Sequence, residues 1–295
     1  MSLDVTVIGL GSMGRGMARA CLKAGHRVQG QDVVPERVTA FIAEGGHDGP
    51  MNAPDAVVIV VLNAEQTEAV LFGEDGIAPR LKAGAVVIAC ATVPPEFARR
   101  MEARCADLGL YYLDAPISGG SVKAAQGRLS IMASGSDAAF VAARPVLDAT
   151  AETVFHLGDA AGAGSAMKAV NQLLAGVHIA AMAEAMTFGM TQGITPETFL
   201  DVISKCAGTS WMLENRAPHI VAGDYTPHSQ VNIWPKDLGI VLDTASASGF
   251  AAPITEAALG QYRQAVELGL GREDDAAVAK VYARASGLTL PEETS

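Results

Sequence analysis

The N-terminal stretch of the chain reads Val5-Thr6-Val7-Ile8-Gly9-Leu10-Gly11-Ser12-Met13-Gly14. A short β-branched run, typical of a buried strand, breaks here directly into the pattern Gly-x-Gly-x-x-Gly. In a dinucleotide-binding turn, Gly9 allows the tight bend, Gly11 lets a pyrophosphate approach the backbone, and Gly14 lets the next helix pack closely. The pyrophosphate would lie on the N–H groups that begin that helix. We therefore predict a cofactor-binding turn over residues 9–14; the alternative is a glycine-rich turn in another kind of βα unit.

The residues after this turn favour the dinucleotide interpretation. A helical stretch, Arg15 to Ala24, leads to a second predicted strand, Arg27 to Gln31, which ends at Asp32. An acidic residue there, roughly 20 residues after the turn, accepts hydrogen bonds from the adenine ribose and repels the additional phosphate of NADP. No arginine follows directly, so the sequence favours NAD over NADP. Asp32 could also cap the helix that Pro35 begins, and the two roles are compatible.

Composition narrows the class of protein. The chain has 295 residues, of which 49% are hydrophobic and 18% charged, which suits two folded domains. Its net charge of −11 argues against nucleic acid or an anionic membrane as the main partner. The four cysteines show no metal-ligand spacing and the histidines form no HExxH motif, so we expect no metal site. We expect the cysteine thiols to be reduced, as in a cytoplasmic protein. We see no secretion signal, and the longest uncharged helical run, Ala169 to Ala183, is shorter than a membrane span.

The order of predicted elements changes in the middle of the chain. In the first half strands alternate with helices; the strands are predicted at Ala56–Leu62, Ala85–Ala89 and Leu110–Leu113, with Ser130–Ala133 and Thr153–Leu157 closing the same sheet. A helix opens at Pro94-Pro95. After the Gly158–Gly164 loop only helical patterns follow, beginning with one from Ser165 to Thr191. We predict an α/β fold: a Rossmann-type doubly wound parallel sheet over 1–161, then an all-α domain over 162–295 for substrate binding and oligomerisation.

The helix from Ser165 is apolar almost all round, which predicts a buried position. Lys168 is the exception. Burial of an amine favours its neutral form, and a neutral lysine can act as a general base. Gln172 lies one turn later on the same face, with Asn171 beside it. Alternatively, the helix starts at the surface and Lys168 extends into water.

A second polar cluster, Asp114-Ala115-Pro116-Ile117-Ser118-Gly119-Gly120, follows a predicted strand. Ligands of open α/β sheets bind outside the carboxyl ends of the strands. The N–H groups of the Ser118-Gly119-Gly120 turn and the Ser118 hydroxyl could bind a carboxylate. A purely structural glycine loop is the alternative. This cluster favours the catalytic interpretation of Lys168.

Together these motifs resemble the β-hydroxyacid dehydrogenase family, which includes 3-hydroxyisobutyrate dehydrogenase and tartronate semialdehyde reductase. Four motifs occur in the family's order: the glycine turn at 9–14, the loop Asp114–Gly120, the helix start Gly162–Lys168, and Lys236-Asp237. The resemblance covers essentially the whole chain. It implies that Lys168 is catalytic and that Ser118, Gly119 and Gly120 bind the substrate carboxylate.

The resemblance also implies roles for further residues. The cofactor would contact Leu62, Asn63, Thr92 and Lys236, and the substrate would contact Asn171 and Gln172. Where the family usually has two asparagines after the lysine, this chain has Asn171-Gln172, so the pocket should differ. Segments such as Asn171–His178 and Gly223–Pro227 resemble the L-threonate dehydrogenase branch. The region between Gly45 and Asp55 is shorter than usual in the family.

These observations predict an NAD-dependent dehydrogenase of a small hydroxy acid, such as the four-carbon sugar acid L-threonate. A homodimer or homotetramer is expected, because the near-apolar helix would pack against a second subunit. A 3-hydroxyisobutyrate dehydrogenase, or a tartronate or succinate semialdehyde reductase, is the main alternative. Imine reductase relatives often replace the lysine, whereas Lys168 is intact. A non-catalytic NAD-binding module is the remaining alternative.

Overall fold

The computed structural model describes residues 2–292 and divides into two compact units, Met1–Lys168 and Ala169–Ser295. The sequence places the boundary at 161/162, in the loop before helix α7 (Ala163–Thr191), whereas the division falls inside that helix. Each unit has a hydrophobic core of its own.

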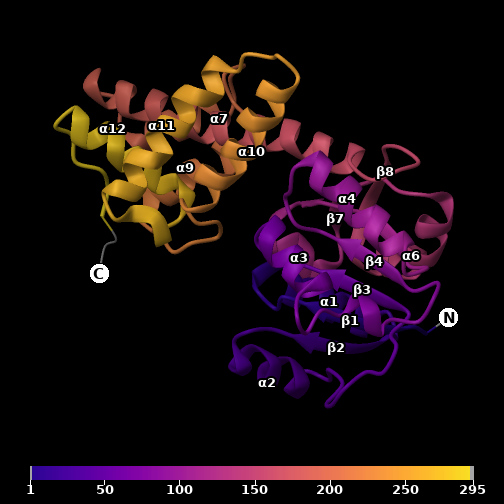
Figure 1. Ribbon diagram of the computed structural model, residues 1–295. Coiled ribbons are helices and arrows are strands. Elements are labelled where there is room, and N and C mark those ends of the chain that lie inside the picture. Colours follow the sequence, from indigo (N-terminus) through magenta and orange to yellow (C-terminus); the bar gives the residue numbers. More distant parts are fainter. Residues whose placement is uncertain (1, 293–295) are drawn as a thin grey trace. The chain divides into compact units, whose positions relative to one another are not determined.

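The first unit is built on a five-stranded sheet in which all neighbouring strands are parallel. Its order is β2-β1-β3-β4-β5, and β1 to β4 are labelled in Figure 1. The strands are β1 (Asp4–Ile8), β2 (Arg27–Gln31), β3 (Ala56–Ile59), β4 (Val86–Ala89) and β5 (Tyr111–Asp114). The central strands are apolar throughout, because a parallel sheet is covered on both faces.

Two core clusters cover the two faces of this sheet. Val58 and Ile88 belong to one cluster, which includes Met17 of helix α1; Val57 and Val87 belong to the other. The helices that follow the first four strands are α1 (Ser12–Lys23), α2 (Pro35–Ala43), α3 (Ala64–Phe72) with the short helix η1 (Ala78–Arg80), and α4 (Pro95–Ala106). No helix or strand lies between α2 and β3, where the sequence is short. The predicted doubly wound Rossmann-type sheet is confirmed.

The late strands differ from the prediction. β6 (Ile117–Ser118), β7 (Leu129–Ala133) and β8 (Ala151–His156) form a separate three-stranded sheet, with α5 (Gly120–Gln126) and α6 (Asp137–Thr150) between them. An isolated bridge between Asp114 and Ser134 connects it to the end of β5. The prediction that these strands close the main sheet was wrong, because an apolar run identifies a strand but not its distant pairing partner.

The second unit is helical, as predicted: among residues 169–292 the structure shows one isolated bridge, Gln230 to Asp274, and no strand. After α7 come α8 (Pro196–Ile203), α9 (Trp211–Ala222), α10 (Ile233–Ala247), α11 (Pro253–Glu267), η2 (Leu270–Arg272), η3 (Asp275–Val278) and α12 (Ala279–Ala285). Trp234 stacks on Tyr262 at 5.5 Å, and the Tyr262 hydroxyl donates to the Gly176 carbonyl of α7. These contacts join α10 and α11 to α7.

Helix α7 departs from the prediction in two ways. It has 29 residues, so by length and composition it could cross a membrane, although the sequence suggested too short a run. This is weak evidence, because the core helix of a globular protein passes the same test. The helix is also not buried all round: Met167, Val170, Leu174 and Phe188 are 44–66% exposed. Their spacing places an apolar stripe along one exposed side of α7.

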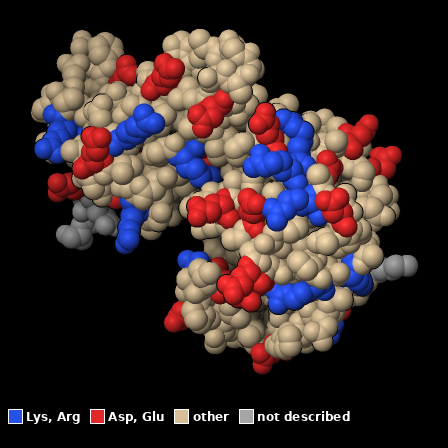
Figure 2. Space-filling view, in the orientation of Figure 1, with Lys and Arg blue, Asp and Glu red and all other residues tan. Residues whose placement is uncertain are grey.

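Charged side chains of both signs are interspersed over the surface. Figure 2 shows acidic and basic residues alternating across the visible face. Such mixing fits a chain with 21 basic and 32 acidic residues.

Candidate active site

The glycine turn after β1 has the tight geometry that its sequence predicts. Gly9 has φ +96°, and a Cβ there would lie 2.2 Å from the Val60 carbonyl oxygen. A Cβ on Gly14 would lie 1.8 Å from the Gly9 carbonyl oxygen. Neither position can accept a side chain without moving the backbone.

Gly11 differs from these two glycines, because a Cβ there would meet nothing within 4 Å. It precedes α1, whose first N–H groups have no side-chain cap. An open approach to uncapped N–H groups is the arrangement that binds a phosphate. The turn therefore has the geometry that the pyrophosphate of a dinucleotide requires, and residues 9–14, including Leu10, Ser12 and Met13, would hold it.

Asp32 lies at the carboxyl end of β2 and contacts the same turn. Its carboxylate accepts hydrogen bonds from the N–H groups of Leu10 (2.7 Å) and Val34 (2.9 Å). Arg37 lies 3.3 Å from Oδ1. Burial opposes ionisation, but these hydrogen bonds and the Arg37 charge outweigh it, so the pKa of Asp32 falls below its usual value. Asp32 is thus ionised at neutral pH.

The predicted cofactor contacts of the next strands lie at the same edge of the sheet. Asn63 follows β3 and caps helix α3, accepting from the Gln66 N–H at 2.8 Å, while the Leu62 N–H donates to the Gln66 side chain. Thr92, half-buried, follows β4. Carboxyl ends of parallel strands meet at one edge, so these residues share it with the glycine turn and Asp32.

Asp114, at the end of β5, is buried and organises the start of α7. Its carboxylate accepts from the N–H groups of Gly162 (2.9 Å) and Ser165 (2.8 Å) and from the Ser165 hydroxyl (2.7 Å). Burial raises the pKa of the Asp114 carboxyl, against the lowering effect of the bonds from Ser165 and Gly162. The sequence analysis named Asp114 as part of a motif without giving it a role. In the structure Asp114 caps the helix that carries Lys168.

Lys168 is buried, with 8% of its surface exposed. Its Nζ donates to the Ile117 carbonyl oxygen at 2.9 Å. The structure thus disfavours a lysine that extends into water, and it brings the amine to the residue before Ser118. Gly119 and Gly120 follow with φ values of +132° and +74°, a backbone conformation that side chains disfavour. Lys168 and the loop of Ser118, Gly119 and Gly120 therefore lie together within the first unit.

The predicted residues of the second unit form a chain of contacts of their own. Asn171 donates to the Gln172 oxygen at 2.9 Å, and Gln172 donates to Asp237 Oδ2 at 2.5 Å. Asp237 is buried, and its Oδ1 lies 2.6 Å from the Lys236 ammonium. Gln172 therefore holds Asp237, a partner that the sequence reasoning missed.

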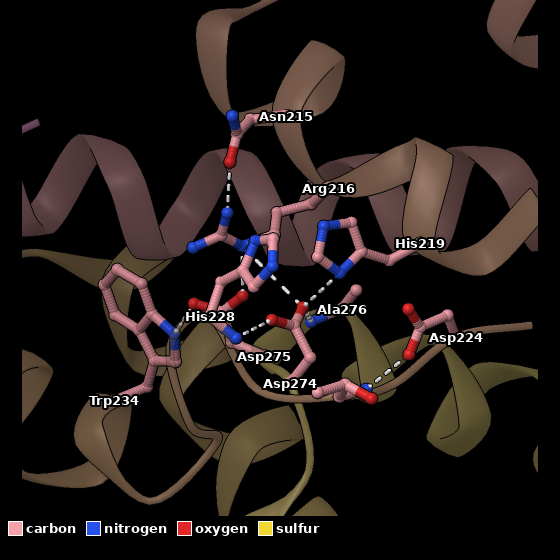
Figure 3. Close-up of polar contacts among 10 residues, drawn as sticks. Asn215, Arg216, His219, Asp224, His228, Trp234, Asp274, Asp275 and Ala276 are labelled. Atoms are coloured by element: carbon pink, nitrogen blue, oxygen red, sulfur yellow. Dashed lines mark hydrogen bonds and ion pairs between the residues drawn. The ribbon is translucent and has the colours of Figure 1, made fainter. Parts of the chain in front are cut away.

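A buried ionic cluster in the second unit was also missed. Arg216 of α9 pairs with Asp275 and lies 3.8 Å from Asp274, and Trp234 donates to Asp275 at 3.0 Å (Figure 3). Burial would raise the pKa of Asp274, but hydrogen bonds from His219 and from backbone N–H groups lower it to about 2. His219, 3.3 Å away, has a raised pKa because Asp274 accepts its hydrogen bond. The cluster fixes the start of α10, the helix that carries Lys236 and Asp237.

Comparison with known proteins places these motifs in context. Residues 4–158 match the family model described as the NAD binding domain of 6-phosphogluconate dehydrogenase. Residues 162–282 match that described as the NAD-binding domain of NADP-dependent 3-hydroxyisobutyrate dehydrogenase.

Individual relatives are similar over nearly their whole length. An L-threonate dehydrogenase of Cupriavidus necator is 49% identical, covering 99% of both chains, and one of Haemophilus influenzae is 47% identical, covering 98% of this chain and 97% of the relative. A crystal structure of 3-hydroxyisobutyrate dehydrogenase from Salmonella typhimurium superposes with a TM-score of 0.89 at 47% identity, covering 94% of this chain and 99% of the other.

Proposed function

The chain belongs to the 3-hydroxyisobutyrate dehydrogenase family, and on that premise we propose that it oxidises a four-carbon sugar acid, L-threonate or a close analogue, with NAD. That it is a nicotinamide-dependent hydroxyacid dehydrogenase follows from the family. The observation that supports Lys168 as the base is the 2.9 Å hydrogen bond from its Nζ to the carbonyl oxygen of Ile117, the residue before Ser118.

In this proposal the first unit supplies the chemistry. The Ser118 hydroxyl and the N–H groups of Gly119 and Gly120 bind the substrate carboxylate. Lys168, oriented by Ile117, takes the proton of the substrate hydroxyl. A bound nicotinamide would accept the hydride from the same carbon. Fixed placement of the lysine contributes much of the rate, because reacting atoms must come within about 3 to 3.5 Å.

Asn171 and Gln172 are proposed to shape specificity rather than to transfer protons. They follow Lys168 on the same helix, at i+3 and i+4, so they are placed to orient the substrate or the lysine. In the structure the Gln172 amide bonds Asp237 and Asn171. We propose that Asn171 contacts the substrate directly and that Gln172 acts by fixing Asn171.

NAD is proposed as the physiological cofactor because Asp32 is ionised and lies against the glycine turn. A carboxylate there accepts from the ribose diol. Asn63, Thr92 and Lys236 are proposed as further cofactor contacts. Reduced, mostly buried cysteines fit a cytoplasmic enzyme. We further propose a homodimer or homotetramer, with the exposed apolar stripe of α7 (Met167, Val170, Leu174, Phe188) at the subunit contact.

The second candidate is a 3-hydroxyisobutyrate dehydrogenase or a semialdehyde reductase. It is favoured by the Salmonella structure, which is named a 3-hydroxyisobutyrate dehydrogenase. Its 47% identity to this chain equals that of the L-threonate dehydrogenase of Haemophilus influenzae. The reaction is reversible, so direction alone does not separate the candidates.

The test is NADH formation from a panel of three- to six-carbon hydroxy acids that includes L-threonate, D-erythronate and 3-hydroxyisobutyrate. We expect the highest kcat/KM with L-threonate or D-erythronate, and a loss of about 100- to 10,000-fold in Lys168→Ala. Lys205→Ala, at an exposed lysine paired with Asp201, is the matched control. A Lys168→Ala enzyme with wild-type rate would refute the lysine's role, and preference for 3-hydroxyisobutyrate would establish the second candidate.

A further inference from the structure

A cavity of about 520 Å³ lies in the second unit, and none of its lining residues has a role in the proposed reaction. Three segments of the chain form its walls. Tyr225 follows α9, Leu268 and Leu270 follow α11, and the third segment runs from α12 to Glu292. Small-molecule sites of globular proteins have volumes of about 300 to 1,000 Å³. The cavity therefore has the size of a binding site of its own.

Part of the cavity wall is apolar. Leucine side chains line it at positions 268, 270, 288 and 290, and Leu270 and Leu290 also pack against the core of the second unit. Leu268 is 38% exposed, which is high for a large apolar side chain. Covering such a surface with the apolar part of a ligand is favourable, because it removes apolar area from water. The charged residues of the same cavity determine which ligands fit it.

Two basic residues of α12 line the cavity. Lys280 and Arg284 are four residues apart, so they lie on the same face of the helix, where like charges repel. Glu273 pairs with Lys280. The Arg284 guanidinium, in contrast, has no hydrogen bond or ion pair with any residue of the described range 2–292. An anionic group that contacts both side chains would relieve their repulsion and give Arg284 a partner.

Tyr225 fixes Lys280 at the wall of the cavity. The Lys280 ammonium lies 3.8 Å from the centroid of the Tyr225 ring, which is a cation–π distance. The Tyr225 carbonyl oxygen accepts from the Asp274 N–H at 2.9 Å, so the tyrosine is anchored to the buried ionic cluster. Its hydroxyl is buried and has no hydrogen-bond partner within the described part of the chain. Burial raises the pKa of Tyr225 to about 13, so this hydroxyl stays protonated and can donate to a ligand.

We infer that this cavity binds a small amphipathic anion. Its carboxylate or phosphate head group contacts Arg284 and Lys280, and its apolar chain lies against Leu268 and the neighbouring leucines. A guanidinium matches the oxygen geometry of both kinds of head group. Glu292 also lines the cavity and pairs with neither basic residue, so it repels the head group and lowers the affinity. The inference goes beyond the proposed dehydrogenase reaction and does not depend on it.

Isothermal titration of the full chain with octanoate and with octyl phosphate, each below its micelle concentration, tests the site. Acetate and inorganic phosphate supply the head groups alone, and octanol supplies the chain alone. We expect one octanoate or octyl phosphate per chain, bound at least about tenfold more tightly than any of these three, because each buried methylene strengthens binding about fourfold. The tighter of the two amphipathic probes identifies the preferred head group.

Three substitutions at exposed positions assign the binding to this cavity. Arg284→Gln should weaken the tighter probe about tenfold or more, the effect of one charge-assisted hydrogen bond. Leu268→Ser should weaken it several-fold by removing apolar wall, and Glu292→Gln should tighten it several-fold by removing a repelling charge. Arg263→Gln is the matched control, because Arg263 is an exposed arginine of the same unit that does not line the cavity.

The outcomes that overturn the inference are distinct. One is the absence of binding of both amphipathic probes to the wild type. Another is binding that Arg284→Gln and Glu292→Gln leave unchanged, since the head group would then lie elsewhere. An equal loss in Arg284→Gln and Arg263→Gln also overturns it, because the probe would then respond to the overall charge of the unit rather than to this cavity.

Discussion

Replacement of Asp114 by alanine should destabilise the first unit and disable catalysis together. Asp114 is buried and accepts from the backbone N–H groups of Gly162 and Ser165. Alanine leaves both N–H groups without a partner, at a cost of about 1 to 2 kcal/mol each. The hydroxyls of Ser134 and Ser165 can turn to other acceptors. We therefore expect a loss of about 2 to 4 kcal/mol in the free energy of unfolding.

The catalytic loss follows from the position of Lys168 three residues after Ser165 on the helix that Asp114 caps. A displaced helix start moves Nζ away from the Ile117 carbonyl oxygen. A shift of about 1 Å in a catalytic group can reduce the rate about 100-fold. Asp114→Asn keeps the shape and one oxygen acceptor and removes a buried charge, so it should fall between wild type and alanine in both stability and kcat.

The assay pairs urea unfolding, followed by circular dichroism, with kcat and KM measured where each variant is fully folded. Ser136→Ala is the control, because Ser136 caps α6 by accepting from the Ala139 N–H, away from the lysine. It should lose about 1 kcal/mol and keep its kcat. If Asp114→Ala unfolds earlier but a folded sample has the wild-type kcat, Asp114 does not position Lys168. A stability loss below about 1 kcal/mol would refute the capping argument itself.

Four further substitutions test other parts of the structure. Gly14→Ala should lower the free energy of unfolding by about 3 kcal/mol or more, because its Cβ would meet backbone at 1.8 Å. Gly11→Ala places its Cβ in open space, so the urea midpoint should stay nearly unchanged. The same variant should weaken NADH binding in a fluorescence titration. His219, whose pKa is raised by Asp274, contributes stability that is full below about pH 6.5 and lost as pH rises through its higher folded pKa. Thermal melts from pH 5 to 9 should show this decline in wild type and not in His219→Gln; parallel curves would contradict it. Gln172→Ala should lower the free energy of unfolding by about 1 to 3 kcal/mol, because it leaves a buried oxygen of Asp237 unpaired. In steady-state kinetics it should raise KM more than it lowers kcat. An unchanged KM would mean that Gln172 is structural only.

The parts of the molecule with local signals were predictable from the sequence. The glycine turn, the strand ending at Asp32 and the long helix after Gly164 each depend on residues close in the chain. The pairing of the late strands was not predictable, because β7 pairs with β6 and β8 rather than with the main sheet, and the residues of a strand do not specify its partner.

The site was predicted as a set of residues but not as a network. Lys168 and Ser118 were predicted from their motifs, yet nothing in the sequence indicated that Asp114 caps the lysine's helix. Asp237 was named only within the Lys236-Asp237 motif, without its bond to Gln172. Arg216, Asp274 and Asp275 were indistinguishable from ordinary charged residues until the fold paired them. Buried charges are rare, so sequence reasoning treats an isolated aspartate or arginine as a surface residue.

The division of the chain at Lys168/Ala169 has a consequence for how such enzymes could diversify. The first unit contains the cofactor turn, the Ser118 loop and the lysine bonded to Ile117. On the proposed assignment, a recombination event with its crossover just after Lys168 would transfer the proposed base and the Ser118 loop and exchange every residue from Ala169 onward, including Asn171, Gln172 and Lys236. Chimaeras joined at that point between relatives with different substrates would inherit turnover from one parent and selectivity from the other. A crossover a few residues earlier, in the Gly158–Gly164 loop, would instead separate the lysine from the carbonyl that orients it.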